Sequence, residues 1–174
     1  MLKSAPPDFA KHDKAMARLS RYEQRFVLSP DRFKGGSVLP ALAWNTINFS
    51  KAAITTIAST PGLYAFSIVT QRQGLPPHGY VLYIGQTGAK KHSRTLRVRA
   101  GEYLKEKKTG KRKHVWEFLN KWSGHLSFHF ASVDPKTEDL EALEQGLNDA
   151  LMPPYSVNDF SVEIKAQKKA WQLT

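Results

Sequence analysis

The residue whose surroundings most favour chemistry is Glu144, because its neighbours at helical spacing are apolar. In LEALEQGLNDAL, at 3.6 residues per turn, Glu144 lies within or beside a stripe made by Leu140, Leu143, Leu147 and Leu151. A carboxylate on the core-facing side of a helix is costly unless it is ion-paired or binds a metal. The pattern therefore indicates a functional or ion-paired Glu144, and the alternative is a glutamate at the edge of the stripe that reaches water.

A second candidate is an arginine and a tyrosine on the helix that follows YIGQTG. Arg99 precedes Tyr103 by four residues, so the two side chains lie on one side of that helix, near the edge of its apolar face. A guanidinium group there suits a phosphate, which it binds through two parallel hydrogen bonds. The alternative is one surface arginine among several, such as Arg94 and Arg97.

Two short sequence motifs pair a glycine with a tyrosine at or beside an apolar run. They are PGLYAFSIV at residues 61–69 and YVLYIGQTG at residues 80–88. Tyr64 and Tyr83 would then stand on neighbouring strands. The alternative is that both are ordinary strand aromatics, which tyrosine commonly is.

The charge of the chain is uneven along the sequence. The 174 residues carry a formal net charge of +11, and residues 86–122 hold twelve Lys or Arg against three acids, whereas residues 123–151 hold one Lys against six acids. Such an asymmetric field predicts a polyanionic partner, most commonly nucleic acid, and a solvated basic face without a partner is the alternative. Within the basic block, Lys111, Arg112 and Lys113 form a turn suited to a phosphate backbone.

Several functional classes are excluded by what the sequence lacks. There are no cysteines, which removes disulfides, thiolate metal sites and a cysteine nucleophile. No H-E-x-x-H, Walker loop or G-x-S-x-G motif is present, and no acidic cluster falls on adjacent strands. A divalent cation would therefore have few protein ligands, which suits Mg²⁺ with its retained waters. No apolar run approaches the roughly 20 residues of a membrane helix, and the N-terminal residues lack the apolar core of a signal peptide, so we expect a cytoplasmic protein without a membrane partner.

The elements that must position these residues follow from hydrophobic periodicity and turn signals. Helices are expected at residues 8–28, 48–59 (capped by Asn48 or Ser50), 96–104 and 115–122, and from Asp134-Pro135 to about Leu151; strands are expected at residues 63–69, 80–84 and 125–133. From residue 61 the order is β-β-α-α-β-α. The sequence thus predicts an α+β domain with a small, mostly antiparallel, three-stranded sheet flanked by helices.

Together these features resemble the GIY-YIG nuclease family over residues 60–160. The motifs that carry the resemblance are Gly62-Leu63-Tyr64 (with Leu in place of Ile), Tyr83-Ile84-Gly85 followed by Gln-Thr, Arg99 with Tyr103, Glu144, and Asn158 after the double proline. The order of elements is also that of the family. Residues 1–59 match no known pattern and are expected to form a helical extension that contacts DNA or mediates dimerisation. Residues 161–174 are expected to form a basic tail.

The resemblance implies a metal-dependent endonuclease that hydrolyses phosphodiester bonds in DNA, most simply duplex DNA, and a restriction-type enzyme is one such role. By resemblance, Tyr64 activates water, with Arg99 and a nearby cation favouring its phenolate, and Tyr83 positions water or polarises Tyr64. Arg99 holds the scissile phosphate, Tyr103 orients a phosphate or the water, and Glu144 ligates one Mg²⁺ or Mn²⁺.

Other roles stay open at this point. A repair, mobile-element or phage nuclease fits the same residues. Two readings from other classes are a nucleic-acid-binding module on the same fold without cleavage and a structural adaptor for a protein partner. A single site cuts one strand at a time, so cleavage of both strands of a duplex implies a homodimer or two successive binding and cleavage events.

Overall fold

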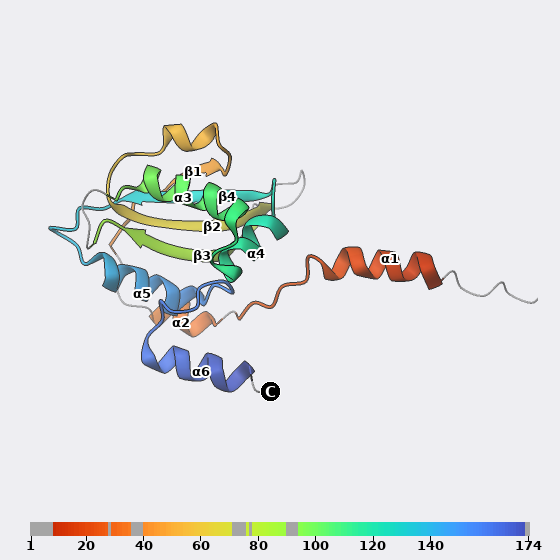
Figure 1. Cartoon of the computed structure of the whole chain (residues 1–174). Helices are drawn as coiled ribbons and strands as arrows, with labels where there is room; N and C mark the ends of the chain where they lie inside the picture. The colour runs from red at the N-terminus through yellow and green to blue at the C-terminus, as the bar shows by residue number, and fades with distance from the viewer. Residues whose placement is uncertain are drawn as a thin grey trace, which may run out of the picture.

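The computed structural model describes residues 9–27, 29–35, 40–70, 76, 78–89 and 94–172. It is an α+β structure around one antiparallel sheet in the order β1-β4-β2-β3 (Figure 1). The strands are β1 (Asn45–Asn48), β2 (Gly62–Thr70), β3 (His78–Thr87) and β4 (Leu126–Ser132). The helices are α1 (Phe9–Ser20), α2 (Pro30–Gly35), α3 (Leu96–Thr109), α4 (Lys113–Lys121), α5 (Leu140–Leu151) and α6 (Val162–Gln172), with a 3-10 helix η1 (Ala53–Thr56).

The α+β class and the antiparallel pairing are confirmed, but the predicted three-stranded sheet is wrong because β1 adds a fourth strand. β1 lies in the region expected to be purely helical, and it pairs with β4 so that Ile47 stands opposite Phe128. The predicted helix at residues 48–59 is also wrong, since only the four residues of η1 are helical there. Tertiary contacts explain this: the Phe49 N–H donates to the Leu126 carbonyl at 2.8 Å, and the Phe49 ring packs edge-on against Phe66.

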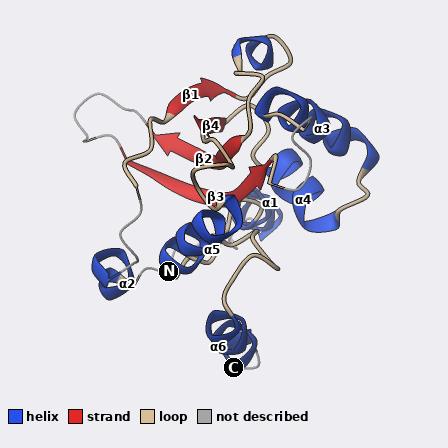
Figure 2. Cartoon of the chain, turned by 90° about the vertical axis from the view of Figure 1, so that its left-hand side faces the viewer, coloured by secondary structure: helices blue, strands red, loops and turns tan. Residues whose placement is uncertain are grey.

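Two layers of helices cover the sheet, and the alternation of side chains along β2 decides which residues meet which layer. Tyr64 and Phe66 belong to the main core, together with buried residues of α3 and α4 such as Tyr103 and Phe118. Leu63 points to the other face, where it packs with Leu140, Leu143 and Val133. Figure 2 shows α3 and α4 together on one side of the sheet, with α5 beside β3.

The outer edge of β3 is closed by α5 and the segment that follows it. The Tyr155 N–H donates to the Leu82 carbonyl at 3.0 Å, and the Ile84 N–H donates to Ser156 Oγ at 3.3 Å. The Gln86 N–H donates to Glu144 Oε1 at 3.0 Å. Glu144 is therefore fixed against β3, the strand that carries Tyr83-Ile84-Gly85.

α5 begins five residues later than the sequence predicts. Asp134 caps a turn instead, because its carboxylate accepts the Lys136 N–H at 2.9 Å. The true N-cap is Asp139, whose side chain accepts the N–H groups of Glu141 and Ala142 at 3.0 and 3.1 Å. Starting there turns Leu140 and Leu143 onto the sheet.

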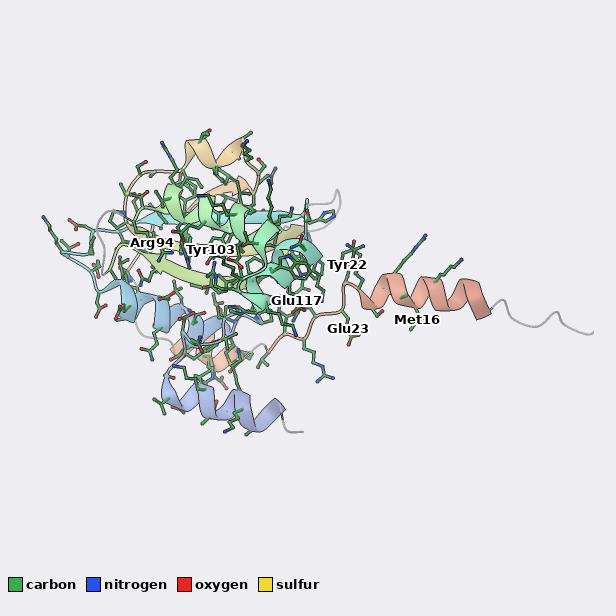
Figure 3. The ribbon with its side chains drawn as sticks, viewed as in Figure 1. Met16, Tyr22, Glu23, Arg94, Tyr103 and Glu117 are labelled. Carbon is green, nitrogen blue, oxygen red and sulfur yellow. The ribbon has the colours of Figure 1, made fainter. Side chains whose placement is uncertain are left out.

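Both ends of the chain differ from expectation. The first helix stops at Ser20 rather than near residue 28, and residues 21–27 form an extended arm along the body. The arm packs on α4 through Tyr22, whose ring lies 5.3 Å from that of Trp122; Figure 3 labels Tyr22 beside Glu117 of α4, and Met16 on α1, which points away from the body. The basic C-terminal segment forms the helix α6 over most of its length. Within the described ranges no helix is long and apolar enough to cross a lipid bilayer.

Candidate functional site: a tyrosine and arginine cluster

Tyr64, Arg99 and Tyr103 form a hydrogen-bonded triangle between β2 and α3. The hydroxyl oxygens of Tyr64 and Tyr103 lie 2.9 Å apart. Arg99 donates to both, from Nε to Tyr64 at 2.9 Å and from Nη2 to Tyr103 at 3.3 Å. The guanidinium carbon lies 4.8 Å from the centre of the Tyr103 ring, so charge and ring also attract each other.

Two glycines allow close contacts around the cluster, one between β3 and Tyr64 of β2 and one between β2 and β4. Gly85 stands opposite Tyr64 in the strand pair, and a Cβ placed on it would lie 2.3 Å from the Tyr64 hydroxyl oxygen. A Cβ on Gly62 would lie 2.0 Å from the Ala131 carbonyl oxygen on β4. Both glycines therefore serve packing: Gly85 accommodates the Tyr64 side chain, and Gly62 accommodates the backbone of Ala131.

The start of α3 fixes Arg99 relative to the sheet. Thr95 is the N-cap, and its hydroxyl accepts the Val98 N–H at 3.4 Å. The Leu96 N–H donates to the Thr60 carbonyl at 2.8 Å, and Arg97 Nε donates to the Ile57 carbonyl at 2.7 Å. These bonds tie the helix to the segment that leads into β2, so the spacing from Tyr64 to Arg99 is determined by the fold.

Tyr83 completes the aromatic part of the cluster from β3. Its ring stacks on Phe118 at 5.8 Å, and its centre lies 6.4 Å from Tyr64 and 6.0 Å from Tyr103. Tyr64, Tyr83 and Tyr103 are all buried, and the exposed fraction of Tyr64 is 1%. The structure thus brings the three predicted tyrosines and the predicted arginine together.

The electrostatics of the cluster keep the phenols of Tyr64 and Tyr83 protonated. Burial raises the pKa of Tyr64 well above its ordinary value, Tyr103 and Tyr83 raise it further, and Arg99 only partly offsets them. Burial and Tyr103 likewise raise the pKa of Tyr83. Arg99 does lower the pKa of Tyr64, as expected, but burial raises that pKa by more, so the phenol form prevails.

Sequence reasoning missed Glu102, which holds the other side of Arg99. Glu102 Oε2 accepts from Arg99 Nη1 at 2.7 Å, and the same carboxylate binds Arg94, with Arg94 Nε at 3.2 Å from Oε1 (Figure 3 labels Arg94 beside the start of α3). Burial alone would raise the pKa of Glu102, but the hydrogen bonds from Arg94 and Arg99 lower it overall. The three-residue spacing from Arg99 to Glu102 was a signal that could have found this pair.

Glu144 lies half-buried at the edge of β3, where Gln86 binds one of its oxygens. Burial raises the pKa of Glu144 to about 7; Asp159 raises it too, while the Gln86 N–H and Arg99 lower it. Its titration is therefore coupled to that of Asp159 and to the charge of Arg99. A carboxyl group that titrates near neutral pH and has a carboxylate neighbour is suited to capturing a cation.

Asp159 is a second residue that the sequence did not single out. Burial raises its pKa, and Lys165, His114 and Arg99 lower it. The residue chosen by resemblance, Asn158, is exposed in the segment between α5 and α6, and within the described ranges no hydrogen bond joins it to the cluster. No periodicity marks Asp159, because an irregular segment brings it near Glu144.

The three residues of the basic turn differ in their surroundings: Arg112 contacts the tyrosine cluster, whereas Lys111 and Lys113 face solvent. Arg112 lies with its guanidinium carbon 5.1 Å from the Tyr103 ring centre, and its backbone N–H donates to the buried Glu106 at 2.6 Å. Lys111 and Lys113 are exposed. A shallow hollow beside α3 is lined by Arg94, Arg99, Glu102, Lys105, Glu106, Thr109, Lys111 and Arg112. Five of these eight residues are cationic, so the hollow favours an anion.

The donors present fit a hard divalent cation with few protein ligands. Asp159 raises the pKa of Glu144, so it makes ionisation of Glu144 more costly, and a cation between the two carboxylates would offset that cost. Within the described ranges no three His, Cys, Asp or Glu side chains form a metal-binding group. One or two carboxylates with retained waters is the coordination that Mg²⁺ commonly takes in phosphate-binding sites.

The chain was also compared with known proteins. No model of a protein family, no curated protein and no solved structure matches it.

Proposed function

We propose that the protein is a metal-dependent endonuclease that hydrolyses phosphodiester bonds in DNA, in the manner of the GIY-YIG nucleases that its motifs resemble. The observation that carries this proposal is the triangle in which one guanidinium group binds the hydroxyls of Tyr64 and Tyr103. Three hydrogen-bonding groups meet there beside a cationic hollow, and Arg99 also lowers the pKa of the Glu144 carboxyl group. Phosphoryl chemistry needs such charge and positioning more than it needs covalent groups.

Each residue has a role in this proposal. Arg99 binds the phosphate that is cleaved and neutralises charge as the phosphorus gains a fifth oxygen. Tyr64 orients the attacking water through its hydroxyl, which is itself held by a hydrogen bond with the Tyr103 hydroxyl. Tyr83 packs against both rings and keeps them aligned. Because the pKa of Tyr64 is raised in the structure, its proton leaves only once positive charge has gathered in the site.

Glu144 would hold the cation, with Asp159, which raises the pKa of Glu144, as a second carboxylate. When bound, Mg²⁺ or Mn²⁺ supplies charge that polarises the phosphate and lowers the pKa of nearby water and phenol groups. Glu144 can serve this role through its second oxygen while the first stays on the Gln86 N–H. The pKa of about 7 means that the ionised, cation-binding form of Glu144 prevails only above neutral pH.

Cleavage of defined substrates tests the proposal. Supercoiled plasmid, linear duplex, single-stranded DNA and RNA are incubated with Mg²⁺, with Mn²⁺ or with EDTA. We expect a supercoiled plasmid to be nicked or linearised in either cation and to stay intact in EDTA. Wild-type cleavage that persists in EDTA, or Glu144→Gln cleaving as well as wild type, would remove the metal-dependent mechanism.

A second candidate is a nucleic-acid-binding module that does not cleave. The burial of Tyr64, whose exposed fraction is 1%, favours it, because a water must reach the hydroxyl to be activated and little of the Tyr64 surface is accessible. The same experiment separates the two functions. A protein that binds these DNAs but leaves all of them intact in Mg²⁺ and Mn²⁺ is such a module.

A further inference from the structure

A second cationic groove lies outside the tyrosine cluster, between the N-terminal arm and α6. Its walls are the arm at residues 24–27, the segment at residues 152–160 and one side of α6. The cations that line it are Arg25, Lys165, Lys168 and Lys169, and none of the described lining residues is an acid. In Figure 1, α6 lies on the far side of α5 from the sheet. The groove therefore gathers four positive charges from the two ends of the chain.

The floor of the groove is apolar and one of its lysines is held in place. Phe160 is buried, and the Lys168 ammonium lies 4.0 Å from the centre of its ring while donating to the Ser156 carbonyl at 3.2 Å. Lys168 is half-buried, and this burial lowers its pKa. Arg25, Lys165 and Lys169 are exposed at the rim. A fixed cation beside an aromatic ring, with exposed cations around it, suits a chain of phosphates more than a single small anion.

The groove continues toward the catalytic cluster along the segment that closes β3. Ser156 belongs to the groove and also accepts the Ile84 N–H of β3. Lys165 lowers the pKa of Asp159, and Asp159 in turn raises that of Glu144. Charges of the groove thus act on the carboxylates of the site, which requires the two to be near each other.

We propose that this arm–α6 groove binds the sugar–phosphate backbone of the nucleic acid on one side of the bond to be cleaved. The proposal rests on the proposed function for its polyanion, and it assigns a substrate role to the arm and to α6. Charge decides the occupant: four cations, with no acid among the described lining residues, repel a basic segment and attract a polyanion. The basic turn at Lys111 and Lys113 would serve the other side of the cluster.

The test is the salt dependence of binding, which needs no cleavage. A labelled duplex of about 30 base pairs is titrated in EDTA at salt concentrations from about 50 to 300 mM, because each lost phosphate contact removes about one unit of slope in log K against log salt. The double variant Lys165→Gln with Lys169→Gln should lose about two units of slope relative to wild type. Lys165→Arg with Lys169→Arg keeps the charge and should keep the slope. The matched control is Lys51→Gln with Lys136→Gln, two exposed lysines outside the groove, which should also keep it.

The outcomes distinguish a failure of the groove proposal from a failure of the proposed nuclease activity. A wild-type slope in the Gln double variant, with thermal unfolding unchanged, would overturn the groove even if the protein cleaves DNA. Equal losses in the Gln variant and in the Lys51 and Lys136 control would overturn it as well, since net charge alone would explain them. A slope that depends on Lys165 and Lys169 in a protein that never cleaves would support the groove and refute the nuclease. A wild-type protein that binds no duplex would refute both.

Discussion

The hydroxyl of Tyr64 lies directly over the backbone of Gly85, its partner across the β2–β3 pair. A Cβ added to Gly85 would stand 2.3 Å from that oxygen and 2.5 Å from the ring carbon that bears it. No side chain other than hydrogen fits there while Tyr64 keeps its bonds to Arg99 and Tyr103. The Tyr64 side chain therefore requires a glycine at position 85.

Gly85→Ala should displace Tyr64 and lower the free energy of unfolding by about 1–3 kcal/mol, as overpacking of a core does. In a Tyr64→Ala background the methyl group has room, so the two changes should couple by about 1 kcal/mol or more in a double-mutant cycle. Gly101→Ala is the control, because nothing lies within 4 Å of its added Cβ, and in a helix it should stabilise. Additive effects of Gly85 and Tyr64 would contradict the packing described here.

Tyr64→Phe removes one oxygen and keeps the ring in the core. Two hydrogen bonds are lost, and we expect the free energy of unfolding to fall by about 1–3 kcal/mol because the Tyr103 hydroxyl and Arg99 lose a partner. If Tyr64 orients the attacking water, turnover should fall by roughly 10²–10⁴-fold. Binding should be nearly unchanged. Single-turnover cleavage beside a binding titration in Ca²⁺ measures both, and a variant that cleaves like wild type would exclude Tyr64 from the mechanism.

Glu144 should make stability fall as the pH rises. Its pKa is about 7 in the folded protein against an ordinary value of 4.5. Between these values the folded state binds more protons than the unfolded state, so the free energy of unfolding decreases through that window and levels off above it. Glu144→Gln should flatten this decrease by about 1–3 kcal/mol. Denaturant unfolding of both proteins from pH 4 to pH 8 is the measurement, and parallel curves would show that the pKa is not raised.

The same carboxylate gives a metal prediction whose readout is stability. At pH 8 the carboxylate is ionised, so Mg²⁺ should raise the unfolding temperature of wild type by binding the folded state. Glu144→Gln should show no such shift, and Asp159→Asn a smaller one than wild type. An equal shift in wild type and Glu144→Gln would place the cation elsewhere.

In the basic turn, the exposed lysines and Arg112 should behave differently. Lys111→Ala with Lys113→Ala should lower the salt slope of DNA binding by about two units and leave stability unchanged. Arg112→Ala should also lower the free energy of unfolding by about 1–3 kcal/mol, because Glu106 is 8% exposed and loses its charged partner. Thermal melts beside binding titrations separate the two effects. Equal stability losses in both variants would mean that Arg112 has no structural role.

Most of the sheet and its covering helices could be predicted from sequence, because apolar periodicity marks them. The strands around Tyr64, Tyr83 and Phe128 lie where the alternation indicates, as do the helices around Tyr103 and Phe118. β1 could not be predicted, since its four residues hold one apolar side chain and become a strand only by pairing with β4. The start of α5 was ambiguous for a local reason: Asp134 and Asp139 both satisfy the rules for an N-cap.

The candidate site divides in the same way. Tyr64, Arg99 and Tyr103 were identifiable because motif and helical spacing place them, and the structure joins them by hydrogen bonds. Asp159 was not, because its proximity to Glu144 depends on how an irregular segment folds back. The raised pKa of Tyr64 was also beyond sequence, since it arises from burial among rings contributed by three elements.

The closed edge of β3 has a consequence for self-association of the protein. An open strand edge is where another molecule adds a strand, and that is a common route to aggregation. Here the outward-facing groups of Leu82, Ile84 and Gln86 are occupied by Tyr155, Ser156 and Glu144. Glu144 thus has a protective role that is independent of any catalysis. A side chain at position 144 that cannot accept a hydrogen bond would expose the Gln86 N–H, and such a variant is expected to self-associate at concentrations where the wild type does not.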